Sequence, residues 1–250
     1  MKIGVEILGE TVINGEKVGH ASPKDALLND IVQEIGTDNL YISQITKIVL
    51  VDNTGTERDS TTSITKTDNT GASPPSVQIH GVINITATYT INAVRLYAGS
   101  KLYFETSWNK SVESGDQADI TVTIQMSVSG SLSGTTTGSL SDDSGLVRNL
   151  LKALIGASRE QIGFHYGVLR GVVDTTLADL VIATMSNTID TANNKVDGDS
   201  GLVSPTTTGD ASVLEFRNFG NTKMVVFSLD ASVPITSETQ VRIQFTFTVS

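Results

Sequence analysis

The chain contains no cysteine and few aromatic residues, and both absences narrow its chemistry. Without cysteine there is neither a disulfide framework nor a thiolate-bound metal. Aromatic residues make up 5% of the 250 residues, and no apolar run approaches the roughly 20 residues that a membrane-spanning helix needs. The first residues, Met1 to Glu6, lack the apolar segment of a signal peptide. We therefore expect a protein that stays in the cytoplasm or leaves it inside a particle.

Basic residues are also scarce. Lys and Arg number 17 against 27 Asp and Glu, which gives a formal net charge of -10. Such a surface repels phosphate backbones and anionic lipid headgroups, so neither nucleic acid nor membrane insertion is expected. Threonine, serine, glycine and valine dominate instead, a mixture typical of β-sandwiches with many turns.

The most informative pattern is a strand that occurs twice, with apolar residues alternating with polar ones up to a final serine. The apolar positions are Ile120, Val122, Ile124, Met126 and Val128 in the first copy, and Val241, Ile243, Phe245, Phe247 and Val249 in the second. Each half also begins with a short apolar helix that ends in Ile-Gly, at 35–36 and 155–156. This repetition indicates two copies of one folding unit.

We therefore expect a mainly β protein made of two tandem antiparallel β-sandwiches, jelly-roll or immunoglobulin-like, each with one short N-terminal helix. The expected divisions are a hairpin arm at 1–20, a first sandwich at 21–129, a flexible Ser/Gly/Thr linker at 130–143 and a second sandwich at 144–250. In the arm, Asn14-Gly15 predicts a type I′ turn. The arm packs either on a neighbouring subunit or on its own domain.

Helix signals are present in both halves. Ser22 is the expected N-cap of the first helix, with Pro23 at its first position and Gly36 as its left-handed stop. Gly156 takes the place of Gly36 in the second helix. We expect each helix to cover an open end or edge of its own sandwich.

Other segments leave more than one interpretation open. Residues 77–91 alternate for too long to be one typical strand, which predicts either a bend at Gly81 or two consecutive strands. Residues 175–189 fit a strand or a helix, because Leu177, Leu180, Val181 and Met185 also have helical spacing. Segments 52–76 and 190–210 are rich in Thr, Asp, Asn and Gly, and are expected to be long exposed loops.

No catalytic signature is present. Gly198-Asp199-Ser200-Gly201 imitates the nucleophile motif of chymotrypsin-like proteases, but the next glycine is replaced by Leu202. Ser200 therefore fits a polar turn better than a nucleophile, which needs an oriented base. His80 falls on the polar face of its strand, and His165 can face either side. No enzymatic activity and no cofactor are expected.

Metal binding has little support in the sequence. The acidic pairs Asp52 with Asp59 and Asp197 with Asp199 are the candidates for calcium, but Asp beside Gly is first of all turn chemistry. No metal site is therefore assigned.

The densest aromatic group supplies the only candidate contact residues. Tyr97, Tyr103 and Trp108 are candidates for exposed contacts with a sugar ring or a subunit. Tyr103 and Phe104 are adjacent, so on a strand one is expected to point outward and the other into the core. The alternative for Trp108 is an ordinary core residue. In the second half Leu229 stands at the position of Trp108, so a shared aromatic binding surface is not a property of the repeat.

One stretch resembles a known group of proteins. The segment Ile91 to Tyr97, followed by Gly99, Leu102, Gly115-Asp116 and the strand from Ile120 to Ile124, resembles virion structural proteins of tailed phages and archaeal viruses. In the second half, Ser237-Glu238 replaces Gly-Asp. The resemblance implies tandem β-sandwiches in a turret, spike, decoration or tail-associated role, and it carries no functional residues to transfer.

The leading hypothesis is a non-enzymatic virion structural protein, assembled in the host cytoplasm, which forms a homo-oligomer and contacts other virion proteins. The alternative is a carbohydrate-binding or adhesin module that recognises a host-surface glycan through its aromatic residues. A stable multimer is the expectation that distinguishes the first hypothesis.

Overall fold

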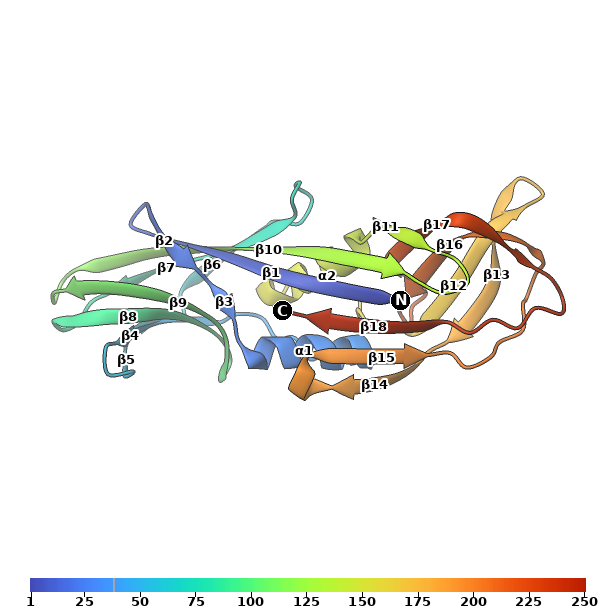
Figure 1. Cartoon of the computed structure of the whole chain (residues 1–250). Coiled ribbons are helices and arrows are strands. Elements are labelled where there is room, and N and C mark those ends of the chain that lie inside the picture. The colour runs from blue at the N-terminus through green and yellow to red at the C-terminus, as the bar shows by residue number, and fades with distance from the viewer. Residues whose placement is uncertain (38) are drawn as a thin grey trace.

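The computed structural model describes residues 1–37 and 39–250. Strands hold 58% of the residues and helices hold 11%, counting two α-helices and one 3-10 turn, so the expectation of a mainly β protein is confirmed. The molecule is elongated, with the two helices at its centre and sheets extending to both ends (Figure 1).

The elements of residues 1–132 are β1 (Lys2–Ile13), β2 (Glu16–His20), β3 (Ser22–Pro23), α1 (Asp25–Gly36), β4 (Lys47–Asp52), β5 (Glu57–Thr61), β6 (Ile64–Asn69), β7 (Ser76–Asn84), β8 (Tyr89–Ala98), β9 (Lys101–Val112) and β10 (Gln117–Leu132). Those of the remainder are β11 (Gly138–Asp142), α2 (Ser144–Ile155), β12 (Tyr166–Val173), β13 (Thr176–Thr184), β14 (Ser186–Asp190), the 3-10 turn Thr191–Asn193, β15 (Lys195–Asp199), β16 (Gly209–Arg217), β17 (Lys223–Ile235) and β18 (Gln244–Val249).

The strands after each helix pair in the same way. In the first half β4 pairs with β5 and β8, β8 with β9, β6 with β7, and β7 with β10. In the second half β12 pairs with β13 and β16, β16 with β17, β14 with β15, and β15 with β18. The strand before each helix also has the same partner, because β3 pairs with β9 and β11 with β17. The hydrogen-bonding scheme of the first half thus recurs in the second.

Strand β1 joins the halves. It pairs antiparallel with β10 along its whole length and parallel with β18 over Lys2 to Val5. Of the two alternatives for the arm, packing on its own chain is therefore the one found. Its turn is as predicted, since Asn14 and Gly15 have φ angles of 50° and 82°.

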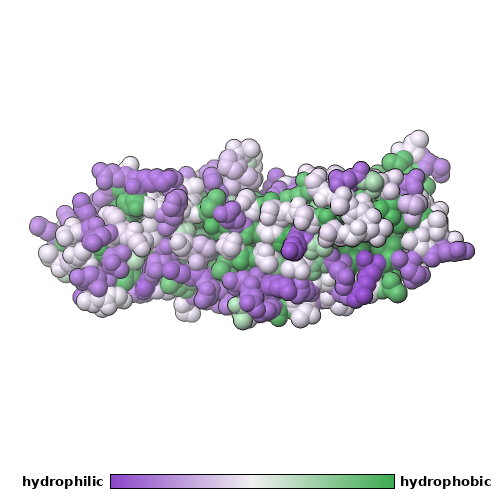
Figure 2. All heavy atoms as spheres, in the orientation of Figure 1, coloured by the Kyte–Doolittle hydropathy of each residue, from purple (hydrophilic) through white to green (hydrophobic). Residues whose placement is uncertain are grey.

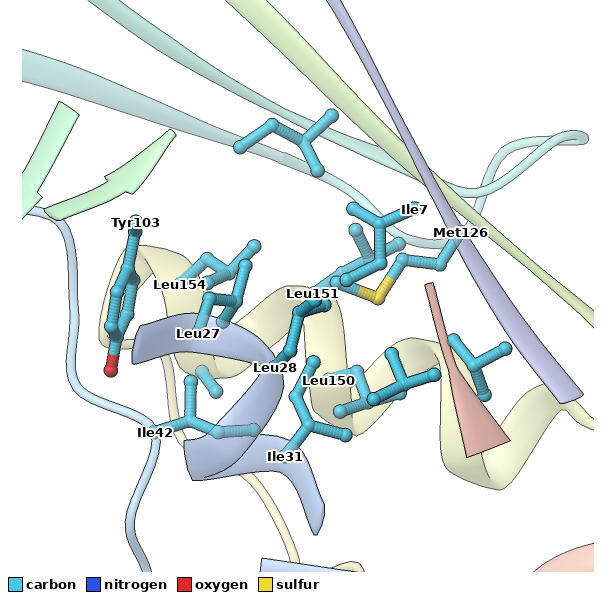
Figure 3. Close-up of a cluster of buried hydrophobic side chains, with 14 of the residues drawn as sticks. Ile7, Leu27, Leu28, Ile31, Ile42, Tyr103, Met126, Leu150, Leu151 and Leu154 are labelled. Atoms are coloured by element: carbon cyan, nitrogen blue, oxygen red, sulfur yellow. The ribbon is translucent and has the colours of Figure 1, made fainter. Parts of the chain in front are cut away.

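The helices contact strands of both halves, which differs from the expectation that each would cover only its own sandwich. Helix α1 packs on β9 of its own half and on β14, β15 and β18 of the other. Helix α2 packs on β17 and also on β6, β7 and β10. Between the helices, Leu27, Leu28 and Ile31 of α1 lie near Leu150, Leu151 and Leu154 of α2 (Figure 3).

The N-cap prediction for α1 is wrong. Ser22-Pro23 forms β3, which pairs with Glu105 and Phe104, and Lys24 takes the N-cap position. The pairing with β9 holds these residues in extended backbone, so they do not enter the helix.

The C-terminal ends of the helices differ. Gly36 lies inside α1, and a side chain there would collide with Ile189 at 2.4 Å, so glycine serves close packing on β14. Gly156 is the predicted left-handed cap, with φ of 71° and its N–H directed to carbonyl oxygens of the last helical turn.

Several segments expected to be irregular are strands. Residues 77–91 form two strands, with the break after Asn84 and not at Gly81, and the open segment 175–189 belongs to β13 and β14. The expected loops hold β5, β6 and β15, and the expected linker holds the end of β10 and β11. These threonine- and serine-rich segments are strands because backbone pairing with a neighbour needs no apolar side chain on the exposed face.

A single main core runs through both halves and the two helices. The alternation of the two repeated strands places Ile120 and Ile124, like Phe245 and Phe247, in this core. In the second half Phe164 forms a ring cluster, with its centroid 5.3 Å from that of Phe216 and 5.2 Å from that of Phe245.

Candidate functional site

The three aromatic candidates do not form an exposed platform. Tyr103 is fully buried, so the prediction of an exposed contact is wrong. Its hydroxyl donates to Asp30 Oδ2 at 2.5 Å and accepts from the Ser43 N–H at 3.0 Å. Burial, followed by the bond to Asp30, raises the pKa of Tyr103. Phe104, on the opposite face of β9, is buried as well, so both faces of the strand are covered here, and α1 and the chain around Ser43 cover the Tyr103 side.

The other two candidates are half-buried. The Tyr97 hydroxyl donates to Glu57 Oε1 at 2.5 Å, and the Lys47 ammonium lies 5.7 Å from its ring centroid. Trp108 packs against the main core, as in its alternative interpretation. The rings of Tyr97 and Trp108 are both partly covered, and the buried Tyr103 does not link them into one exposed surface.

The residues of the protease-like motif build a turn. Ser200 Oγ donates to the Gly201 carbonyl at 2.8 Å and accepts from the Ile243 N–H at 2.9 Å, so its hydrogen bonds go to backbone. His80 lies on another strand, where its ring is 2.8 Å from Asp119. His165 packs against the rings of Tyr166 and Phe219, with centroids 4.4 and 5.0 Å away. Ser200 is therefore bonded to the backbone of its own turn and of Ile243, whereas His80 is bonded to Asp119 on a different part of the sheet.

The acidic candidates for calcium also have structural partners. Asp52 accepts from the backbone and hydroxyl of Thr54, from the Thr56 N–H and from Arg58. The Thr54 hydroxyl is the main cause that holds the pKa of Asp52 well below its usual range. Asp199 is held by Arg242 and Gln244.

The remaining two acids are engaged as well. Asp59 accepts from Thr86 and Tyr89, and Asp197 from Lys195 and Thr246. Within residues 1–37 and 39–250 no group of three His, Asp or Glu side chains is placed to hold a metal ion. In the same residues, no helix has the length and apolar character needed to span a bilayer.

The most distinctive surface lies on the hairpin β12–β13. Asp174 and Thr175 adopt φ angles of 48° and 72° at its turn. The register places Val172 opposite Leu177, and Val168 opposite Ile182, so these four side chains share one face of the hairpin. Val172, Leu177 and Ile182 are 59%, 41% and 43% exposed, and they are called the hairpin patch below.

A charged network holds the middle of this face. Arg217 donates to Asp179 at 2.9 Å and to Glu215 at 2.7 Å, while Arg170 lies 2.7 Å from Asp179 and 3.1 Å from Glu215. Burial alone would raise the pKa of Asp179, but the Arg217 bonds outweigh it and lower that pKa. Because two guanidinium groups and two carboxylates fix one another, β13 is tied firmly to β12 and β16.

The equivalent face of the first half carries polar groups instead. On β4, β5, β8 and β9, Arg95 donates to Glu105 at 2.6 Å, and Tyr97 donates to Glu57. Hydrophobic residues gather more densely at the end of the molecule that holds β12, β13 and β17 (Figures 1 and 2). The exposed aliphatic residues at this face therefore belong to the second half and not to the shared strand scheme.

Sequence reasoning missed the hairpin patch for a local reason. The register of β12 and β13 shifts next to Leu169, so that Leu180 interrupts the strict alternation along β13. The bulge produced the helix-like spacing that left this segment undecided. The Val172 and Leu177 pair on either side of a tight turn was the available signal.

Comparison of the chain with protein-family models, with curated proteins and with solved structures gives no match.

Proposed function

We propose that the chain is a non-enzymatic structural protein of a virion, which assembles into an oligomeric surface projection, decoration or tail component. The observation that carries this proposal is the hairpin patch, a set of exposed aliphatic side chains around a partly buried ionic network. An exposed cluster of large aliphatic side chains is costly in water unless a partner covers it. Because the strands under these side chains are already held in place, less conformational entropy is lost when a partner binds.

The proposed architecture is a tandem duplication of one β-sandwich unit, with units at 21–129 and 144–250. The recurrence of the same strand pairing after each helix supports it. Each helix contacts strands of both units and the core is continuous, so the two units form one elongated body (Figure 1). Such a shape suits a surface projection.

The proposed partner at the hairpin patch is a second copy of the chain. A single kind of subunit with one apolar contact surface forms a closed dimer by self-complementary contact, or a ring or filament when the contact is between different surfaces. Other virion proteins would then bind elsewhere on the oligomer.

Sedimentation velocity over a concentration series tests this proposal. The wild-type protein should sediment as an oligomer, and the double variant Val172→Asp with Leu177→Asp should sediment as a monomer. Val82→Asp is the matched control, since Val82 is 40% exposed on β7 of the first half, and it should leave the oligomer intact. A wild-type protein that stays monomeric at high concentration, or an oligomer that both variants leave unchanged, would refute the proposal.

A further inference from the structure

The second half contains a half-open cavity of about 410 Å³, whose wall holds both aliphatic and polar residues. It is bounded by the turn at 133–136, by β16 and β17, and by the segment 239–244 that leads into β18. Its aliphatic lining is supplied by Leu132, Leu169, Leu214, Leu229, Ile235 and Ile243. The volume lies within the range of small-molecule sites, which are mostly apolar clefts of about 300–1,000 Å³.

The strand scheme places a larger side chain at the equivalent position of the first half. Ser107 pairs with Ala93 on β8, and the register shifts directly after it, at Trp108. Ser228 pairs with Val213 on β16, and the register shifts directly after it, at Leu229. The two residues are therefore equivalent in the strand scheme. Both side chains pack against the main core, and Leu229, the smaller of the two, also lines the cavity.

The polar groups around the opening are already engaged. Arg242 is paired with Asp199, Thr136 Oγ1 donates to the Ala231 carbonyl at 3.3 Å, and Gln240 donates to Ser204 at 3.0 Å. The Met1 ammonium also lines the opening and donates to the Gln244 carbonyl at 3.4 Å, so a cationic ligand would lose its hydration and meet like charge. A neutral ring system would bury apolar surface against the aliphatic residues of the wall.

We propose that this cavity is a binding site for a small, uncharged, aromatic molecule of indole-like size. The inference stands apart from the proposed function, because the cavity and the hairpin patch are formed by different residues. It also explains why the second half has leucine where the first has tryptophan.

Titration with 5-fluoroindole, followed by fluorine NMR, tests the site in the full chain. The wild-type protein should give a saturable shift. Leu229→Trp should abolish it by placing an indole in the cavity, while Leu8→Trp, at a residue 48% exposed on β1, should retain it. Leu132→Phe, at the half-buried edge of the cavity, should weaken binding at least tenfold. This second variant replaces Leu229→Trp in the test if Leu229→Trp fails to fold.

A charged probe separates the proposed ligand class from amphiphiles. Tryptamine, which carries an ammonium group, should bind at least tenfold more weakly than 5-fluoroindole. The absence of saturable binding, equal binding in Leu229→Trp, or tighter binding of the ammonium probe would each overturn the assignment.

Discussion

The two halves share a strand-pairing scheme but complete it with different side chains. Ile120 and Ile124 on β10 occupy the core of the first half, and Phe245 and Phe247 on β18 that of the second. At the equivalent positions Trp108 and Leu229, by contrast, the larger side chain belongs to the first half. The same backbone pairing thus accommodates cores whose large side chains stand at different positions. Hydrophobic cores accept such varied packing when the pattern and the total volume are kept.

The outer faces differ in a way that bears on function. The first half covers its outer face with ion pairs such as Arg95 with Glu105, whereas the second exposes Val172 and Leu177 beside its ionic network. A surface feature found in one of two similarly built halves is not required by the fold. It is therefore the better candidate for a specific function.

The largest expected effect comes from breaking the tie between the halves. Glu34 of α1 is fully buried and paired with Arg159 of the second half, whose side chain is 7% exposed. Arg159→Met leaves that carboxylate without its counter-charge, which is expected to cost about 3–5 kcal/mol in the free energy of unfolding measured with urea. Lys17→Met removes the exposed pair with Glu10 and should cost at most about 1 kcal/mol. Equal losses in the two variants would contradict the account.

A slightly smaller loss is expected from the contact between the helices. Leu151 is fully buried on α2, near Leu28 of α1 (Figure 3), and Leu151→Ala should cost about 2–5 kcal/mol. Because the core is continuous, calorimetry should show one transition that moves to lower temperature as a whole. Two transitions, of which one stays in place, would mean that the halves unfold independently.

Acid sensitivity offers a way to compare the networks of the two outer faces. The pKa values of Glu105 and Asp179 are both lowered, in each case because ion-pair bonds outweigh burial. The stabilisation is therefore complete above the unfolded-state pKa values of about 4 and is lost as the pH falls through the folded-state values. Urea unfolding between pH 7 and pH 2 should show falling stability. Asp179→Asn and Glu105→Gln should each flatten that dependence. A variant with the wild-type pH dependence would show that its network does not contribute to the acid sensitivity.

The smallest effect on folding is expected at the hairpin patch. Leu177→Asp changes an exposed side chain and should alter the free energy of unfolding of the monomer by no more than about 0.5 kcal/mol. The measurement is urea unfolding at a protein concentration low enough for the monomer. A loss of several kcal/mol would show that Leu177 belongs to the core and not to a contact surface.

The sequence predicted the features that depend on periodicity and local turn chemistry. Alternation revealed β10 and β18, Asn14-Gly15 revealed the turn of the arm, and Gly156 revealed the end of α2. These signals are carried by neighbouring residues, so they survive without knowledge of tertiary contacts.

The features that depend on distant contacts were not predictable. Tyr103 is buried by α1, and Gly36 is required by the approach of Ile189 from the other half. The bulge at Leu180 concealed the strand that carries the hairpin patch. Each error arises where a partner far along the chain determines the environment, and a single sequence does not reveal that partner.

The most direct test of the account is hydrogen exchange of the wild-type protein at low and high concentration, resolved along the chain. The account predicts that amides of residues 172–182 become more protected at high concentration, while those of the equivalent strands β4 and β5 do not change. Protection that is independent of concentration along β12–β13, or that appears on β4 and β5 instead, would contradict assembly through the hairpin patch.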